Sequence, residues 1–131
     1  MNKKLYYTLN CTWGILMTLI GLLCASVLSA TKHTAYNYRG CLHYKVGKNW
    51  GGVSLGLVII TDVTPSDHTL KHEYGHTLQN ALYGILFPFI VAIPSAMRYH
   101  ERIILAKKGA ELEPYDAVWY EGQATEWGNK Y

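Results

Sequence analysis

The sequence has little charge and little cysteine, and both shortages exclude classes of protein. Only 16% of its 131 residues are charged, against about 25% in an average soluble domain, while 50% are hydrophobic. This balance indicates contact with membrane lipid. The net charge of +3 is spread along the chain without a long run of like charges, which argues against nucleic acid as a partner. The three cysteines are odd in number and imply no disulfide framework, so we expect Cys41 to be a buried reduced thiol.

The first apolar run divides the chain into two parts. No charged residue occurs in residues 5–31, and residues 11–30 are just long enough to cross a bilayer as one helix. No good signal-peptidase site follows this run, so a retained anchor fits better than a cleaved signal peptide. We therefore expect a membrane anchor over residues 1–31 and one folded domain over residues 32–131, since a domain commonly needs about 100 residues.

The middle of the chain predicts a strand followed by a helix. Residues 53–61 are rich in β-branched side chains and predict one strand that is buried on both faces. Turn and cap residues follow, so a helix is expected from His68 to about Leu82. Gly75 lies inside this helix and costs about 1 kcal/mol of helix propensity relative to alanine. That cost is reasonable if the helix backbone must pack closely against something at this point, and the alternative is that the helix merely tolerates the glycine.

Two further segments complete the chain. Residues 81–97 form a second uncharged run, which Pro88 and Pro94 interrupt, and a charged amphipathic stretch follows it. Residues 115–129 are expected to form the last helix.

Two histidines and a glutamate in the first of these helices form a motif with chemical meaning. His72 and His76 are four residues apart, so their imidazoles point to the same helix face and can bind one metal ion. Glu73 is rotated by about 100° around the helix from His72, where it can accept a proton from a water beside the metal. Zinc lowers the pKa of water toward 7 and polarises a carbonyl group. The alternative is a polar helix face on which the histidines only titrate.

The motif HEYGH followed by Leu-Gln resembles the zincin metallopeptidases, and more specifically short bacterial and phage-type domains of this group. The resemblance covers residues 50–128. Together with the apolar run at the N-terminus, it implies an α+β fold in which an N-terminal transmembrane helix precedes a minimal zincin-like domain. That domain would contain a small β-sheet, an active-site helix, an apolar helical hairpin and a C-terminal glutamate helix. The strand over residues 53–60 would form a rim that pairs with extended substrate.

The third metal ligand separates the groups of zincins. In the metzincin pattern a glycine and a histidine would stand at the positions of Gln79 and Leu82, so this group is excluded. The gluzincin pattern takes a glutamate from a later helix, which implies Glu121 as the third zinc ligand and leaves Glu126 as its competitor. Gluzincins usually carry an aspartate where Thr125 stands, so its role beside a ligand histidine stays open.

Several other polar residues have weaker signals. Gln79 follows His76 by three residues and could line the cleft, but an ordinary polar helix position also explains it. Three acidic residues close to Pro114 are expected in a solvated loop: Glu111, Glu113 and Asp116. A donor to the oxyanion of the reaction is sought among four residues: Tyr115, Tyr120, His100 and Tyr131.

Ligation by Glu121 restricts the membrane topology, because residues 81–97 separate it from the two histidines. If that run crossed the bilayer once, Glu121 would lie about 30 Å away on the opposite face. We therefore expect a single N-terminal span and a second apolar segment that is re-entrant or interfacial. An ordinary pair of apolar core helices satisfies the same restriction and is the alternative.

The leading interpretation is a membrane-anchored zinc metallopeptidase that hydrolyses peptide bonds, with Glu73 as general base. Its partners would be a peptide or protein substrate and membrane lipid. One alternative is a non-catalytic membrane interaction or toxin-control protein that holds a structural zinc. A small membrane-perturbing protein that binds no metal is the third interpretation.

Overall fold

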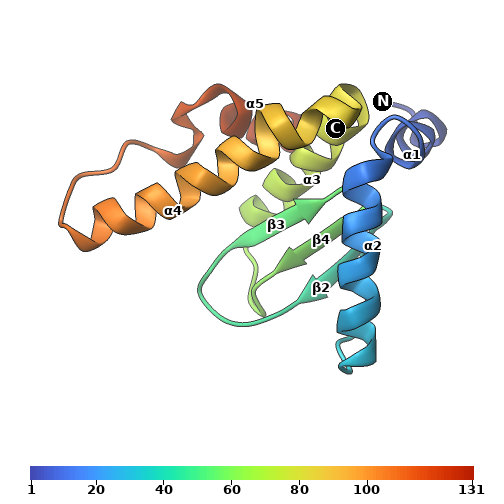
Figure 1. Cartoon of the computed structure of the whole chain (residues 1–131), viewed down its shortest axis with the longest axis horizontal. Helices are drawn as coiled ribbons and strands as arrows, with labels where there is room; N and C mark the ends of the chain where they lie inside the picture. Colours follow the sequence, from blue (N-terminus) through green and yellow to red (C-terminus); the bar gives the residue numbers. More distant parts are fainter.

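The computed structural model describes residues 1–131 and confirms the α+β class (Figure 1). The helices are α1 (Lys3–Cys11), α2 (Ile15–Ala30), α3 (Asp67–Tyr83), α4 (Ile93–Lys107) and α5 (Trp119–Lys130). The strands are β1 (Tyr36–Tyr38), β2 (Cys41–Lys45), β3 (Gly52–Leu55) and β4 (Val58–Thr61). Short 3-10 turns occur at Gly84–Leu86 and Tyr115–Ala117, and a π-helical turn occurs at Pro88–Ala92.

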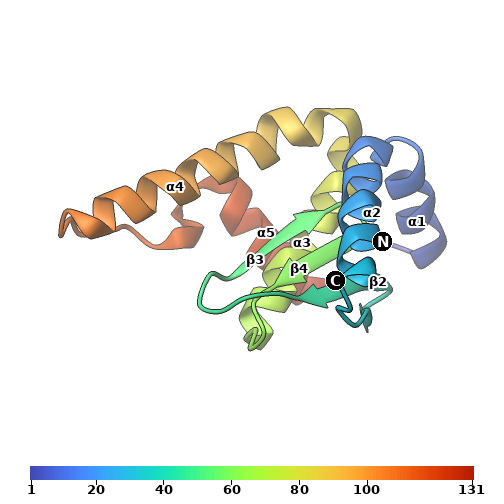
Figure 2. The same cartoon turned by 60° about the horizontal axis from the view of Figure 1, so that its bottom comes forward.

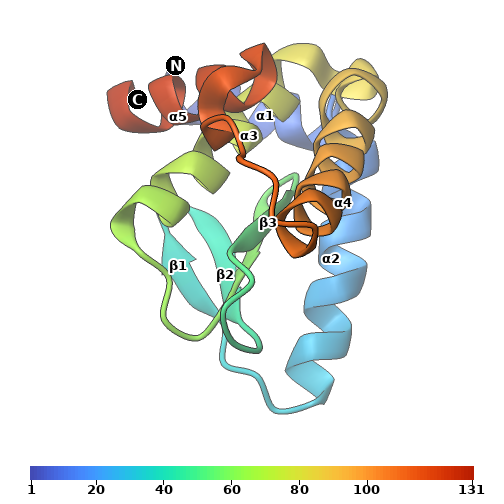
Figure 3. The same ribbon diagram turned by 90° about the vertical axis from the view of Figure 1, so that its left-hand side faces the viewer.

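The four strands form a small mixed sheet in the order β1-β2-β4-β3. The central pair, β2 and β4, is parallel, whereas β1 and β3 pair antiparallel at the two edges. Helix α3 and helix α2 contact the sheet from opposite sides (Figure 3). Helix α3 therefore lies across the sheet from the apolar helix α2.

The expected single strand over residues 53–61 is wrong, because the segment forms the hairpin β3–β4. The two halves pair antiparallel with Val53 opposite Ile60. The turn between them needs glycine: Gly56 has φ +62°, and a Cβ there would lie 2.2 Å from Thr18 Oγ1. No proline and no charged residue separates the two halves, which is why the composition predicted one continuous strand. Of these two strands, only β3 lies at an edge of the sheet.

Helix α3 matches its prediction closely. It begins after Ser66, whose side chain accepts a hydrogen bond from the Thr69 backbone N–H, and it ends at Tyr83. The expected close approach at Gly75 is also confirmed. A Cβ at Gly75 would lie only 1.8 Å from the carbonyl oxygen of Ala124, so the backbones of α3 and α5 are in direct contact.

The predicted spanning helix over residues 11–30 is not confirmed. No single helix in the structure is long and apolar enough to cross a membrane. Helices α1 and α2 together have the length and composition, but they meet at an angle of 86°. The bend is packed against α3, since a Cβ at Gly14 would lie 2.6 Å from Asn80 Nδ2.

The N-terminal helices contact the rest of the chain through buried groups. The hydroxyl of Tyr6 lies 2.6 Å from Thr77 Oγ1 and 3.0 Å from Cys41 Sγ, and Asn80 donates to Asn10 Oδ1 at 2.6 Å. Cys41 is a free and buried thiol, as expected. One stripe of α2 packs on the sheet, with these residues buried: Met17, Thr18, Gly21 and Ala25.

The second apolar run forms an elbow, residues 84–92, between α3 and α4. The two long helical segments on either side of Phe87 meet at 117°. Helix α4 then extends away from the body (Figure 2) and buries none of its residues. The returning chain is tied to α4 by Arg98, whose guanidinium donates to the carbonyl oxygen of Tyr115 at 2.7 Å.

Candidate metal centre

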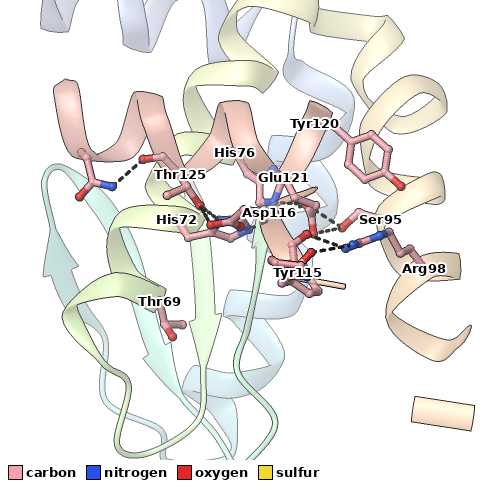
Figure 4. A network of polar contacts seen from close by, with 12 residues as sticks. Thr69, His72, His76, Ser95, Arg98, Tyr115, Asp116, Tyr120, Glu121 and Thr125 are labelled. Carbon is pink, nitrogen blue, oxygen red and sulfur yellow. Dashed lines mark hydrogen bonds and ion pairs between the residues drawn. The ribbon is translucent and has the colours of Figure 1, made fainter. Parts of the chain in front are cut away.

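Three buried side chains from two helices meet at one point (Figure 4). His72 and His76 lie one turn apart on α3, with ring centroids 4.7 Å apart. Glu121 reaches them from the first turn of α5. Its Oε1 atom lies 3.0 Å from His76 Nε2 and 3.8 Å from His72 Nε2. The contact between α3 and α5 at Gly75 brings the carboxylate to the two rings.

The Nδ1 atom of His72 is held by a two-step hydrogen-bond chain. Thr125 Oγ1 lies 2.8 Å from His72 Nδ1, and the Thr125 hydroxyl donates to Asp116 Oδ2 at 2.9 Å. A hydroxyl has one proton to donate, so Thr125 must accept the bond from His72 Nδ1–H. The neutral ring of His72 therefore presents the lone pair of Nε2 to the common point.

The Nδ1 atom of His76 is held by Gln79. The amide nitrogen of Gln79 donates to the carbonyl oxygen of Tyr120 at 2.9 Å and to Gln123 Oε1 at 3.0 Å. This pattern fixes the orientation of the amide, so Gln79 Oε1 accepts from His76 Nδ1–H at 2.7 Å. Both histidines are thus oriented with Nε2 toward Glu121, an arrangement typical of metal-binding histidines.

Glu73 lies on the cavity side of the two histidines. A cavity of about 360 Å³ lies beside the centre, and Glu73 and His76 form part of its wall. Most of the rest of the wall comes from β3, the elbow and α4, and Met17, Trp50 and Tyr115 complete it. Burial raises the pKa of Glu73 to about 7, so its carboxyl group changes charge near neutral pH.

Burial also affects the pKa values of His72, His76 and Glu121. It lowers the pKa of His72 to about 4, and the neighbouring His76 adds to this effect. For His76, burial alone would lower the pKa, but the hydrogen bond to Glu121 and the nearby carboxylates outweigh it and raise the pKa. Against the effect of its own burial, the pKa of Glu121 is lowered by the same bond. His76 Nε2 and Glu121 Oε1 therefore share a proton. The same two atoms would bind a metal ion, which would replace that proton.

The buried group satisfies the geometric needs of a metal site. His72, Glu73 and His76 offer ligand atoms that all lie within 4.8 Å of one another. A tetrahedral zinc ion separates its ligand atoms by about 3.3 Å, since each lies about 2.0 to 2.1 Å from the metal. The distances from Glu121 Oε1 to the two Nε2 atoms, 3.0 and 3.8 Å, bracket this value. The group can hold a metal ion, and its nitrogen and oxygen donors fit zinc.

No family model, curated protein or solved structure matches this chain.

The two glutamates of α5 have different positions. Glu121 is fully buried at the histidines, whereas Glu126 is exposed to solvent.

Of the residues considered as oxyanion donors, Tyr115 and His100 line the cavity and Tyr120 does not. Tyr131 is exposed at the C-terminus, with 54% of its surface accessible.

Two polar residues beside the centre were missed by the sequence interpretation. Asp116 was expected in a solvated loop, but its Oδ2 accepts from Thr125, and its buried Oδ1 lies 3.8 Å from His72 Nδ1. Gln79 was considered an ordinary polar position, yet it is fully buried and bonded to His76. For Gln79, the spacing of three residues after His76 was a signal, because it places both on one helix face. For Asp116 no local signal existed, since the contact joins a loop to two helices.

Proposed function

We propose that this chain is a zinc metallopeptidase in which His72, His76 and Glu121 hold the metal. One observation carries the proposal: both Nε2 atoms and a buried carboxylate converge while both Nδ1 atoms are held by other side chains. Two imidazoles and one carboxylate form a ligand set typical of catalytic zinc sites, which keep one position for water or substrate. Glu73 is also close to the histidines, but it lies in the cavity wall, which suits a base better than a ligand.

Glu73 is the general base in this proposal. When bound, zinc supplies polarisation of the scissile carbonyl and makes water more acidic. Glu73 accepts the proton of the attacking water and later gives a proton to the leaving amine. Its pKa of about 7 is close to the optimum for a group that must accept and donate protons at neutral pH.

Tyr115 is the best placed donor to the developing oxyanion. It lines the cavity together with Glu73 and His76. Burial, followed by its hydrogen bond to Glu121, raises the pKa of Tyr115, so its hydroxyl keeps its proton at physiological pH. A protonated hydroxyl beside the reacting carbonyl can stabilise negative charge in the transition state.

The cavity supports an extended peptide as the substrate. Strand β3 pairs only with β4, so one edge of its backbone is free to bond with a further strand. Four residues of β3 line the cavity, and apolar side chains of the elbow face them. A peptide added to β3 would place its backbone beside Glu73 and its apolar side chains against the elbow.

The test combines metal analysis with one conservative variant. Purified protein is expected to hold one zinc ion per chain and to cleave peptides from a mixed library, detected by mass spectrometry. Glu73→Gln should keep the zinc and lose at least about a hundredfold in rate, because the amide cannot accept the proton. His72→Ala should lose the metal.

Three outcomes would overturn the proposal. Absence of bound metal would favour the membrane-perturbing interpretation. Zinc with four protein ligands and no hydrolysis would favour a structural clip in an interaction or toxin-control protein. Full activity in Glu73→Gln would remove Glu73 as the base.

A further inference from the structure

Helix α2 is apolar on the side that faces away from the sheet. Its inner stripe is buried, and the outer residues would normally be polar in a helix that faces water. Here they are exposed and apolar, with accessible fractions up to 69% at Leu23. The exposed residues are Leu16, Leu19, Ile20, Leu22, Leu23 and Val27.

A second exposed apolar surface runs along the elbow and α4. The spacing of Ile93, Met97 and Ile104 places them on one face of α4. Between 51% and 67% of the surface of each residue is accessible to solvent. This face lies opposite Arg98 and Arg102, which contact the returning chain. On the elbow and the end of α3, the exposed apolar residues are Leu82, Ile85, Leu86 and Phe89.

The two surfaces lie on the same side of the molecule. Figure 3 shows α2 and α4 together on the right, with β1 and the start of α3 on the opposite side. We name this side the platform and define it by the exposed apolar residues of α2, the elbow and α4 given above. Exposed apolar surface of this extent marks a contact with lipid or with a partner.

Charge identifies lipid as the occupant of the platform. Residues 1–61, which include α2, contain no aspartate or glutamate. Lys32 follows the end of α2, and exposed Lys107 and Lys108 lie at the end of α4. Apolar helix faces that end in lysines are typical of segments that lie in the interface of an anionic membrane.

The packing of α2 decides between lying in the membrane and crossing it. The inner stripe of α2 contacts β2, β3 and β4. If α2 crossed the bilayer, it would carry these strands and the free edge of β3 into hydrocarbon, where unpaired backbone groups are very costly. An orientation in the plane of the membrane keeps the sheet in water and places only the platform in lipid.

The cavity lies directly behind the platform. Met17, on the inner side of α2, lines it at one end, and Phe87 and Val91 of the elbow line it further along. Ala92, Ala96 and Tyr99 continue this wall. The catalytic groove is therefore bounded by the same two helical segments that form the platform.

We propose that the platform binds in the plane of an anionic bilayer and presents the catalytic groove to peptide segments that emerge from that bilayer. The platform stands on its own observations, and the substrate class rests on the proposed peptidase function. The substrate is an extended, largely apolar segment next to a membrane anchor.

The first experiment measures membrane binding without catalysis. Glu73→Gln protein, added from dilute detergent to preformed vesicles, is separated by flotation. Vesicles of phosphatidylcholine with phosphatidylglycerol should bind it at least about tenfold better than phosphatidylcholine alone at low salt, and the difference should shrink at high salt. Leu23→Gln and Phe89→Gln should each reduce binding about tenfold. Val63→Gln is the matched control, because Val63 is 42% exposed but lies outside the platform, and it should bind normally.

The second experiment determines the orientation of α2. Single cysteines are placed at Thr12→Cys and Thr31→Cys, at its two ends, in a background that lacks the native cysteines. An impermeant thiol reagent outside the vesicles should label both positions. Labelling of one end only would mean that α2 crosses the bilayer and would overturn the in-plane arrangement. A stable dimer that buries α2 and does not float with vesicles would assign the platform to a second copy of the chain.

The third experiment tests the substrate class. Two peptides share one apolar sequence, and one of them carries an acyl anchor. On anionic vesicles the anchored peptide should be cleaved at least about tenfold faster, and Leu23→Gln should remove this preference while leaving cleavage of the free peptide in detergent unchanged. Equal rates for both peptides would overturn the substrate class. Flotation without any cleavage would leave the platform intact and refute the peptidase function instead.

Discussion

Asp116 reaches His72 through the hydroxyl of Thr125, which lies 2.9 Å from Asp116 Oδ2 and 2.8 Å from His72 Nδ1. Asp116→Asn or Thr125→Val should each weaken zinc binding about ten- to hundredfold, because His72 loses the group that orients it. Affinity is measured by competition with a chromophoric chelator. The double variant Asp116→Asn with Thr125→Asp should recover most of the loss, since it puts a carboxylate directly beside Nδ1.

The exposed Glu126 provides the control for this series. Glu126→Ala should leave the zinc affinity unchanged, whereas Glu121→Ala should reduce it more than any change around Thr125, because a ligand itself is lost. The reverse order of the two glutamate variants would transfer the ligand role to Glu126. Failure of Thr125→Asp to rescue would show that Asp116 acts on the fold rather than on His72.

Glu73 should make the stability of the metal-free protein depend on pH. Its pKa lies above the ordinary value of 4.5, at about 7, so folding favours the protonated form. This contribution to stability is fully present below pH 4.5 and is lost as the pH rises through about 7. The rise of the Glu73 pKa from 4.5 to about 7 corresponds to about 3 kcal/mol in the free energy of unfolding, because the side chain is buried.

Glu73→Gln stays neutral at every pH and should keep that contribution. In chelator, its free energy of unfolding should therefore exceed that of the natural protein by about 3 kcal/mol more at pH 8 than at pH 4.5. Urea unfolding at the two pH values measures this difference. Glu126→Gln, at an exposed position, is the control. The same difference in both variants would trace the pH dependence to another group.

Gly75→Ala should destabilise the protein although alanine is the better helix former. A Cβ at this position would lie 1.8 Å from the carbonyl oxygen of Ala124, so α5 must move away from α3. We expect a loss of about 2 kcal/mol and weaker zinc binding, because Glu121 moves with α5. Gly109→Ala, with no atom within 4 Å of the new Cβ, should lose only about 1 kcal/mol through its positive φ and should bind zinc normally.

Local periodicity was sufficient to predict one half of the metal centre. The four-residue spacing of His72 and His76 places both rings on one face of α3, and Gly75 in that helix indicated a close backbone contact, which α5 makes. Glu121 came from the resemblance to gluzincins, because nothing in the spacing between two distant helices predicts their contact. Sequence patterns of this kind report contacts only within one element.

Contacts between distant segments explain what the sequence interpretation missed. The turn at Gly56 divides the predicted strand because Thr18 of α2 packs against it, which no pattern within residues 53–61 reveals. Likewise, the bend at Gly14 depends on Asn80 of α3. Asp116 contacts His72 through Thr125 of α5, so this contact depends on the packing of α5 against α3. These features depend on tertiary packing rather than on local propensity.

Tyr115→Phe should separate a role in catalysis from a role in metal binding. The hydroxyl lines the cavity and hydrogen bonds to Glu121, and burial keeps it protonated by raising the pKa of Tyr115. If it donates to the oxyanion, its removal should lower kcat about ten- to hundredfold, with little change in KM or in zinc content, because the interaction is strongest in the transition state. Tyr131→Phe changes an exposed hydroxyl and should have no effect on kcat. A parallel loss of zinc in Tyr115→Phe would instead mean that the hydroxyl serves to position the Glu121 carboxylate, and the donor to the oxyanion would then be sought at His100, which lines the same cavity.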